Sequence, residues 1–395
     1  MASELRRASA MEVDAVTAEH LLTHRRQLHT MPELAFKEVE TSRYLAERLE
    51  ALSPDRLEVG VAETGVVADV KGARPGRAVL VRADIDGLPI QEAGELAFRS
   101  ARRGVMHACG HDVHMAIALE VARAMAERRA QLSGMVRFVF QPAEERGLGA
   151  KPMIEAGVLD GIDRVIGLHV WSELPVGQVS VRPGAMMAGS DMFTLTIRGA
   201  GGHGAQPQYT VDAVVIAAQV VSAIQTLASR ETAPAAPVVI TLGSIHGGSA
   251  ANIVASEVVI QGTLRSLDTE LRARLVRRIA ELAEGIATAM RGHCQFSLES
   301  AVPPVVNDGS VATMVAEAAR TVVGEDAVVM FEPLMVAEDF AYFLQARSGC
   351  FFLLGGAPEG ARVGHHTAEF RIDERCLQLG FRVMMAAVLR LLQQD

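Results

Sequence analysis

The segment with the greatest capacity for chemistry is Met106–His114, which reads MHACGHDVH. It brings a thiol, three imidazoles and a carboxylate close together, and thiolates with imidazoles are the ligands that zinc and neighbouring transition metals prefer. Cys109 and His111 flank a glycine, so both can face one ion, while Asp112 is suited to holding a ring nitrogen from behind. A buried cysteine beside surface histidines is the structural alternative. A thiol hydrolase with Cys109 as nucleophile and His111 or His114 as base is the chemical alternative.

Further polar residues follow apolar runs elsewhere in the chain. Gln141–Glu145 reads QPAEE, so one carboxylate can bind a cation while its neighbour acts as a general base. Acids at a helix N-terminus would also account for these two glutamates. His169 ends another apolar run, where a core histidine with satisfied hydrogen bonds is the common alternative. His365 and His366 follow a glycine-rich stretch that lacks the GK[ST] sequence of a phosphate-binding loop.

Three candidates for substrate binding lie in the middle of the chain. His203 occurs in the glycine-rich turn Gly199–Gly204, Asn252 follows a Gly-Gly-Ser segment, and Arg265 ends an alternating strand pattern. A guanidinium and an amide are suited to binding a carboxylate. An ordinary turn or a surface charge is the alternative interpretation in each case.

The elements that must position these residues are short apolar runs separated by helical patterns. The runs Ala78–Arg82, Met135–Phe140, Arg164–Leu168 and Cys350–Leu354 are typical of parallel strands that are covered on both faces. Strands that alternate with helices indicate an α/β domain. Because ligand sites in open α/β sheets form beyond the carboxyl ends of the strands, we expect one metal site at these ends.

The middle of the chain follows a different order, which predicts a second domain. From Phe193 to Glu299 the pattern is strand, helix, two strands, helix and strand, the split β-α-β unit of ferredoxin-like folds. We therefore expect a second domain at residues 188–300, inserted within a discontinuous first domain at residues 14–187 and 301–395. The length of 395 residues also favours two domains.

Composition limits the classes of partner. The net charge of −9 and the aromatic content of 4% argue against a nucleic-acid surface. No run approaches the roughly 18 apolar residues of a membrane span, and the N-terminus lacks the apolar run of a signal peptide. The four cysteines form no CxxC pair, which indicates a reducing compartment. We expect a cytoplasmic protein with neither a nucleic-acid nor a membrane partner.

The order of several segments resembles that of a known family. RADIDGLPI, MHACGHDVH, FQPAEE, LHVW, GGHGA, GTLR, AEDF and HHTAEF occur, over about residues 20–390, as they do in metal-dependent amidohydrolases and carboxypeptidases that include aminoacylases. The cysteine-containing segment resembles the branch of hippurate hydrolase and auxin–amino acid conjugate hydrolases. The resemblance implies a catalytic α/β domain, an inserted lid, and two divalent metal ions per subunit. Zinc or manganese is expected, with cobalt or nickel as alternatives.

The same resemblance implies a role for each candidate residue. Glu144 matches the catalytic general base. His203 matches a lid histidine that reaches the partner's active site in dimeric relatives, and Asn252 and Arg265 resemble lid groups that hold the substrate carboxylate. The residues that match metal ligands are Cys109, His111, Glu145, His169 and His366.

The implied reaction is hydrolysis of the amide bond of N-acyl amino acids, hippurate-like or related small conjugates, by a water that Glu144 activates. Deacetylation of N-acetylated diamino acids and small-peptide carboxypeptidase or dipeptidase activity are the alternatives within the family. The lid implies a homodimer or a higher homo-oligomer. Counting back from Phe370 selects His366 over His365 as the last ligand. Gln208 and Ala368 depart from the family pattern, in the lid and in the last loop, which leaves the substrate open.

Overall fold

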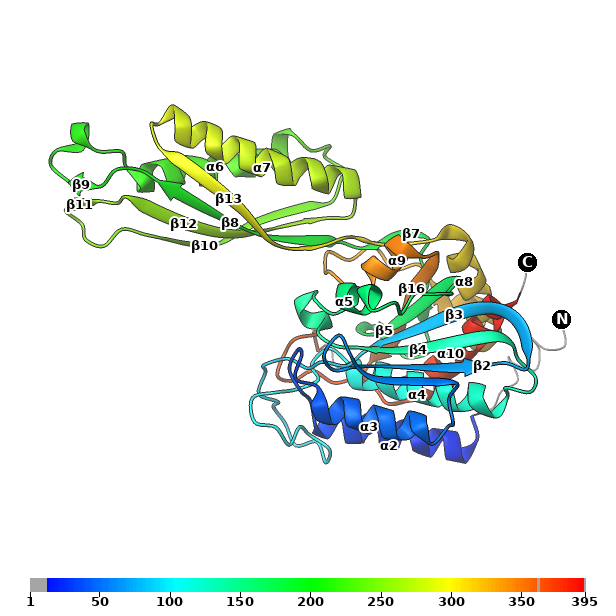
Figure 1. The fold of residues 1–395 in the computed structure, drawn as a ribbon. Coiled ribbons are helices and arrows are strands. Elements are labelled where there is room, and N and C mark those ends of the chain that lie inside the picture. Colours follow the sequence, from blue (N-terminus) through cyan, green and yellow to red (C-terminus); the bar gives the residue numbers. More distant parts are fainter. Residues whose placement is uncertain (1–12, 361–362, 394–395) are drawn as a thin grey trace. The chain divides into compact units, whose positions relative to one another are not determined.

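The computed structural model describes residues 13–360 and 363–393, and the chain forms two compact units (Figure 1). Unit 1 consists of Met1–Gly184, Val306–Glu332 and Asp339–Asp395, and unit 2 consists of Ala185–Val305 and Pro333–Glu338. The sequence-based division had assigned Pro333–Glu338 to the catalytic domain. This segment groups with unit 2, where the Leu334 N–H donates to the carbonyl of Met186 and the Leu334 carbonyl accepts the N–H of Ala188.

A mixed sheet forms the centre of unit 1. Its strands are β1 (Arg56–Val61), β2 (Gly65–Lys71), β3 (Arg74–Asp84), β4 (Ser133–Gln141), β5 (Arg164–Pro175), β6 (Val179–Ser180), β15 (Val328–Val329) and β16 (Gly349–Ala357). Across the described residues they lie in the order β1-β2-β4-β3-β5-β16-β6-β15. The central strands β4, β3, β5 and β16 are parallel. From Ala78 to Asp84, β3 is buried throughout, which explains its continuous apolar run.

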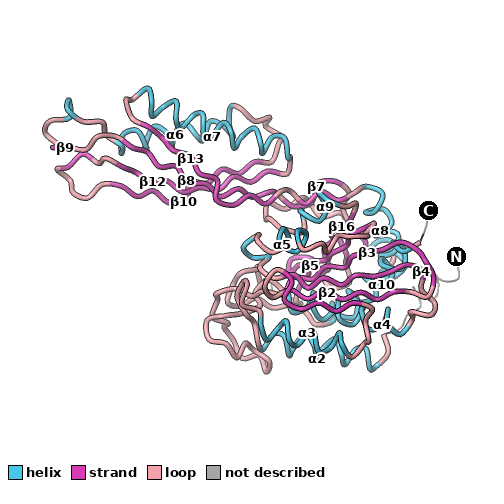
Figure 2. The backbone as a smooth tube through the Cα atoms, viewed as in Figure 1, coloured by secondary structure: helices cyan, strands magenta, loops and turns pink. Residues whose placement is uncertain are grey.

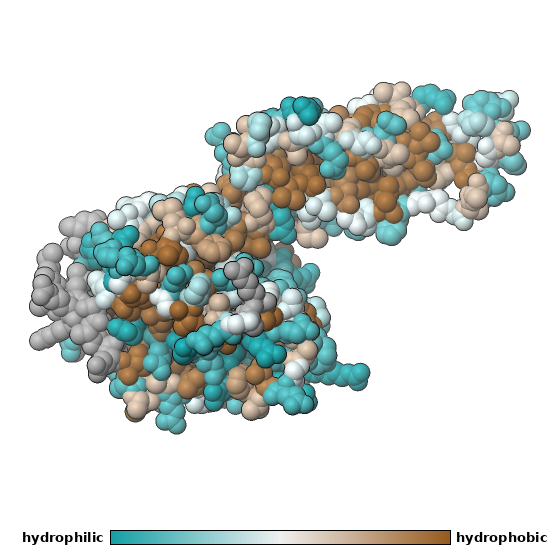
Figure 3. All heavy atoms as spheres, turned by 180° about the vertical axis from the view of Figure 1, so that it is seen from behind, coloured by the Kyte–Doolittle hydropathy of each residue, from teal (hydrophilic) through white to brown (hydrophobic). Residues whose placement is uncertain are grey.

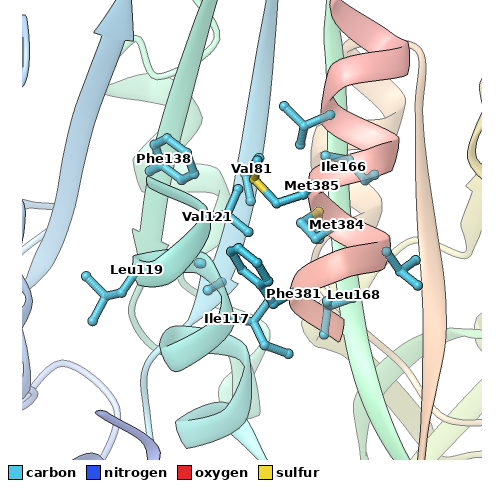
Figure 4. Close-up of a cluster of buried hydrophobic side chains, with 14 of the residues drawn as sticks. Val81, Ile117, Leu119, Val121, Phe138, Ile166, Leu168, Phe381, Met384 and Met385 are labelled. Atoms are coloured by element: carbon cyan, nitrogen blue, oxygen red, sulfur yellow. The ribbon is translucent and has the colours of Figure 1, made fainter. Parts of the chain in front are cut away.

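Helices pack on this sheet and complete the predicted α/β class. They are α2 (Ala15–Thr30), α3 (Val39–Glu50), α4 (His111–Glu127), α5 (Ala150–Glu155), α8 (Gly309–Val323), α9 (Ala341–Ala346) and α10 (Arg375–Leu392). α4 is buried from its first residue to Ala122, because α2 and α10 pack against it as well as the sheet. Figure 4 shows Ile117 of α4 and Phe381 of α10 meeting close to Val81 of β3. The start of α4 is therefore held rigidly against the strand ends.

Unit 2 is an antiparallel sheet with two helices on it. Its main elements are β8 (Gly189–Arg198), α6 (Ala213–Arg230), β10 (Val238–Gly247), β12 (Glu257–Ser266), α7 (Thr269–Ala289) and β13 (His293–Val302). This chain order is the predicted split β-α-β unit, with strand order β10-β12-β8-β13 among the residues described. Both helices contact the sheet, and β8 alternates between buried and less buried residues, as expected when one face is covered.

Shorter strands complete the chain. β7 (Gly184–Met187) pairs with β14 (Val305–Asn307), and β9 (Gly202–His203) pairs with β11 (Ile253–Val254). By length and composition, α6 is the one helix in the described part of the chain that could cross a membrane. Its residues Ile216, Val220 and Ile224 are instead buried in the apolar core of unit 2.

Candidate metal centre

Some of the site residues of unit 1 lie just beyond strand ends, as the sequence predicted, and others do not. β3 ends at Asp84 and β4 ends at Gln141, and Figure 2 shows the loops of unit 1 gathered at one end of the sheet. His169 lies inside β5 rather than at its end, because β5 continues to Pro175. The pairing of His169 with Leu353 of β16 places this imidazole in the middle of the sheet.

A glycine makes the turn between the first two ligand candidates. Gly110 is the N-cap of α4 and has a φ of 94°, a left-handed conformation that glycine adopts without steric cost. A Cβ at this position would lie 2.3 Å from Cγ1 of Val170. The sharp turn and the close approach to β5 therefore both require glycine, and together they direct Cys109 and His111 toward His169.

The five residues that matched metal ligands converge. The donor atoms of Cys109, His111 and His169 lie within 4.8 Å of one another, and so do those of Cys109, Glu145 and His366. The distance from Cys109 Sγ to His169 Nε2 is 3.4 Å, and that from His366 Nε2 to Glu145 Oε2 is 3.3 Å. Cys109 belongs to both groups, so one sulfur can bridge two cations.

The hydrogen bonds of the imidazoles leave their other nitrogens facing this cluster. His111 Nδ1 lies 2.8 Å from the carbonyl oxygen of Asp86, and His169 Nδ1 lies 2.7 Å from that of Val170. Because a carbonyl only accepts, each Nδ1 carries the proton and each Nε2 is available as a ligand atom. His111 Nε2 and Glu145 Oε1 are buried and have no hydrogen-bond partner. Two buried atoms that could bind a metal but have no hydrogen-bond partner, within a set of sulfur, imidazole and carboxylate groups, fit a divalent cation.

The electrostatics of the cluster also favour a cation. Burial alone would lower the pKa of His111, but Asp84, Asp86 and Glu145 outweigh it and raise that pKa to about 10. Burial, with Glu145 next in importance, raises the pKa of the Cys109 thiol well above its ordinary value. The surrounding carboxylates thus stabilise positive charge in the cluster. A bound cation would supply that charge and would favour the deprotonated form of Cys109.

Two polar residues near the cluster have other partners and support it from outside. His114 donates from Nδ1 to Asp84 Oδ1 over 2.6 Å, and its Nε2 accepts the main-chain N–H of Val170 over 2.9 Å. Asp84 Oδ2 accepts from the Arg82 guanidinium over 2.6 Å. Since both nitrogens of His114 are engaged, this residue braces β3 against β5 rather than offering a ligand. Its role did not follow from its sequence spacing, which resembles that of a third metal ligand.

The loop that carries Glu144 is held by two buried carboxylates. Ala143 has a φ of 54°, a left-handed conformation that costs a non-glycine residue about 1–2 kcal/mol. Glu38 accepts the Ala143 N–H over 3.0 Å. Asp86 accepts the N–H groups of Glu144 and Glu145 over 3.2 and 3.0 Å. These contacts turn the two neighbouring glutamates to different positions.

Glu144 and Glu145 consequently differ in what they face. Both lie near His111, with Glu144 Oε2 3.8 Å and Glu145 Oε1 3.7 Å from its Nε2, but of the two only Glu145 also belongs to the group with Cys109 and His366. Glu144 has no place in the group of Cys109 and His366, and its side chain is still partly exposed, so it borders the cluster where a water molecule could meet it. This is the placement that a general base beside a metal pair needs.

The adjacent histidines of the last loop also take separate places. His366 has a φ of 60° and contacts Glu145. His365 stacks on Trp171 with ring centroids 4.5 Å apart, and its Nε2 accepts the main-chain N–H of Ser172 over 3.1 Å. The geometry therefore brings His366 into the donor set and leaves His365 beside it.

The three remaining candidates lie in unit 2. His203 is exposed on β9, and its Nδ1 accepts the Ala205 N–H over 3.1 Å, so the neutral ring carries its proton on Nε2. The carbonyl of Asn252 accepts from Gly204 over 2.8 Å, which ties these two turns together. Arg265 donates to the carbonyl of Met335 over 3.0 Å, and no carboxylate in the described part of the chain pairs with it.

Comparison with known proteins agrees with this arrangement. Residues 80–390 match the model of peptidase family M20/M25/M40. Thermostable carboxypeptidase 1 of Saccharolobus solfataricus is 39% identical, with 90% of this chain and 91% of that protein covered. N-acetylcysteine deacetylase of Bacillus subtilis is 38% identical, with coverage of 90% and 93%. IAA-amino acid hydrolase ILR1-like 2 of Arabidopsis thaliana is 36% identical, with coverage of 94% and 84%.

A solved structure shows the same likeness in three dimensions. The Bacillus subtilis YXEP protein, described as a dinuclear metal-binding peptidase of the M20 family, is 34% identical and superposes with a TM-score of 0.84. The superposition covers 96% of this chain and 99% of that one. The chain belongs to the M20/M25/M40 peptidase family and is a metal-dependent amidohydrolase of the dinuclear type.

Proposed function

We propose that the enzyme hydrolyses the amide bond of N-acyl amino acids, hippurate-like or related small conjugates. The observation that carries this substrate class is Arg265, a half-buried guanidinium without a carboxylate partner among the described residues. A substrate carboxylate would supply that partner. The relatives named for N-acetylcysteine and for IAA–amino acid conjugates support a substrate that carries an amino acid next to the scissile amide.

The proposed ligands of the two divalent cations are those that converge in unit 1, with Cys109 shared. When bound, the cations would lower the pKa of a water molecule and polarise the amide carbonyl. Glu144 would accept the proton of that water at Oε2 and later donate it to the departing amine. Asp86 would keep Glu144 in place by accepting the hydrogen bond from its main-chain N–H. Sulfur with imidazole favours zinc, and manganese, cobalt and nickel are the alternatives.

A thiol nucleophile is the chemical alternative, and the surroundings of Cys109 oppose it. A catalytic thiol needs a lowered pKa, whereas burial and the neighbouring glutamates raise the pKa of Cys109. Chelation separates the two mechanisms, because a thiol enzyme would remain active without metal.

His203 is proposed to contribute to the substrate site of a second copy in a homodimer or larger homo-oligomer, whereas Asn252 is proposed to hold the substrate carboxylate together with Arg265. The exposed Nε2–H of His203 is a donor suited to the oxyanion of the reaction. Figure 3 shows an apolar band on one face of unit 2, and Val214, Val215 and Val239 are 48%, 47% and 40% exposed. An apolar surface of this kind on α6 and β10 is suited to contact with a second copy.

The decisive experiment combines metal analysis with a substrate panel. Protein reconstituted with zinc or manganese would be assayed against hippurate-like, N-acetyl-amino acid, N-acetyl-diamino acid and dipeptide substrates. We expect two cations per chain, highest kcat/KM on N-acyl amino acids, and loss of turnover with retained metal in Glu144→Ala. Preference for N-acetyl-diamino acids or dipeptides would favour the alternative activities of the family. Turnover by Glu144→Ala would remove this residue from its role.

The four free, buried thiols support the predicted cytoplasmic location.

A further inference from the structure

His365 lies next to a proposed ligand, and its two ring nitrogens have different partners. Nε2 lies 3.1 Å from the main-chain nitrogen of Ser172, and Nδ1 lies 3.9 Å from Cys109 Sγ. A main-chain N–H can only donate, so Nε2 must present its lone pair. The ring is therefore the neutral tautomer with its proton on Nδ1, and that proton is directed at the sulfur.

The sulfur receives different contacts from the two imidazoles beside it. His169 Nδ1 donates to a carbonyl, so His169 presents a lone pair from Nε2 at 3.4 Å from the sulfur. His365 presents an N–H donor. The first imidazole is arranged to bind the same cation as Cys109, and the second is arranged to hydrogen-bond the thiolate itself.

The ring of His365 is fixed in this orientation by its packing. It stacks on Trp171 with an interplanar angle of 28°, and its ring centroid lies 4.9 Å from that of Phe370. The main-chain N–H of Ser172 opposes a flip of the ring, because a flipped ring would no longer offer Nε2 as the acceptor of that N–H. The donor is thus preorganised toward a sulfur that both ligand groups share.

We propose that His365 is a positioning residue that donates its Nδ1–H to the bridging thiolate of Cys109 and so sets the orientation and electron density of that sulfur. The inference rests on the ligand set of the proposed function. A hydrogen bond to a metal-bound sulfur withdraws electron density from it, and such bonds tune thiolate–metal sites. Loss of one supporting partner typically lowers metal affinity about 10–100-fold.

Two substitutions separate the two nitrogens. In His365→Asn, the amide nitrogen can occupy roughly the place of Nδ1 and still donate to the sulfur. In His365→Gln, the amide oxygen can occupy roughly the place of Nε2 and accept from Ser172, while the donor to the sulfur is lost. Both variants remove the ring that stacks on Trp171, so stacking does not distinguish them.

The assay is Co²⁺ binding, followed by the thiolate-to-cobalt charge-transfer absorption and by competition with a chelator. We expect the band of His365→Gln to move to lower energy, with Co²⁺ affinity reduced about 10–100-fold. His365→Asn should keep the band near its wild-type position and most of the affinity. Equal effects of both variants, or no shift in His365→Gln, would overturn the proposal.

A further comparison separates this inference from the proposed function. A wild-type protein with no charge-transfer band would refute the ligand set itself, and the inference with it. A wild-type band that is insensitive to His365→Gln would refute only the role of His365. Circular dichroism and thermal melting of the metal-free variants check that both remain folded.

Discussion

Gly110→Ala tests whether the turn between Cys109 and His111 sets the geometry of the metal centre. The new Cβ would lie 2.3 Å from Val170 Cγ1, whereas ordinary contacts begin at 3.4 Å. The turn or β5 must therefore give way by about 1 Å, the difference between these two distances. The φ of 94° adds a strain of about 1–2 kcal/mol for a residue with a side chain.

We expect the displacement to lower both activity and stability. A misplacement of about 1 Å can cost about 100-fold in rate, so kcat/KM should fall about 100-fold. Overpacking and strain together should lower the free energy of unfolding by about 2–5 kcal/mol. The assays are steady-state kinetics, metal stoichiometry after dialysis, and denaturant unfolding.

Gly104→Ala is the matched control. Gly104 also has a positive φ, 77°, but a Cβ there would meet nothing within 4 Å. This variant should therefore show the strain alone, with metal binding and kcat/KM close to wild type. If Gly110→Ala retained wild-type stoichiometry and kcat/KM, the claim that this turn positions both ligands would be refuted.

Three further predictions follow from contacts outside the ligand set. Glu38→Ala leaves the buried Ala143 N–H without its acceptor, so stability should fall by about 1–3 kcal/mol and kcat should fall, whereas Glu38→Gln, which keeps an acceptor oxygen, should recover most of both. His29 has a pKa raised to about 9, because Asp112 and a second carboxylate outweigh the effect of burial. The protonated imidazole contributes fully to the free energy of unfolding below pH 6.5, and this contribution is lost as the pH rises through about 9. Between pH 6 and 10, the free energy of unfolding measured with denaturant should therefore fall by up to about 3 kcal/mol more in wild type than in His29→Gln. Equal losses in the two proteins would contradict this. Arg265→Ala should raise KM for N-acyl amino acids at least 10-fold and leave substrates with an amidated carboxyl group unaffected; equal changes for both would exclude carboxylate binding.

The sequence predicted the elements well and pointed to donor side chains that the structure brings together, because residue type and periodicity are encoded locally. A cysteine and a histidine on either side of a glycine indicate a metal ligand pair from their chemistry alone. The apolar runs that became β3, β4, β5 and β16 indicated parallel strands. The α/β class and the split β-α-β order followed from periodicity, which depends on near neighbours in the chain.

What the sequence could not predict depends on distant contacts. Glu38 accepts the main-chain N–H of Ala143, which lies 105 positions further along the chain, and no local sequence pattern predicts this contact. His365 and His366 are adjacent and chemically identical, so their own chemistry does not separate them. The family spacing from Phe370 selects His366, and the structure adds the reason, since His365 stacks on Trp171 and His366 contacts Glu145. Pro333–Glu338 resembles a connection of the catalytic domain until its hydrogen bond to Met186 is known.

The order in which the sheet of unit 1 is assembled has a consequence for synthesis on the ribosome. β16 lies between β5 and β6, and His366 follows it, so both emerge only after all of β8 to β13 has been translated. Until then a nascent chain carries Cys109, His111 and His169 but leaves one long edge of β5 unpaired, which is open to pairing with other chains. The incomplete centre also lacks the last of the proposed ligands, so we expect tight cation binding only after the final segment has inserted beside a strand that was made long before. Metal uptake in this enzyme is therefore expected to coincide with completed translation.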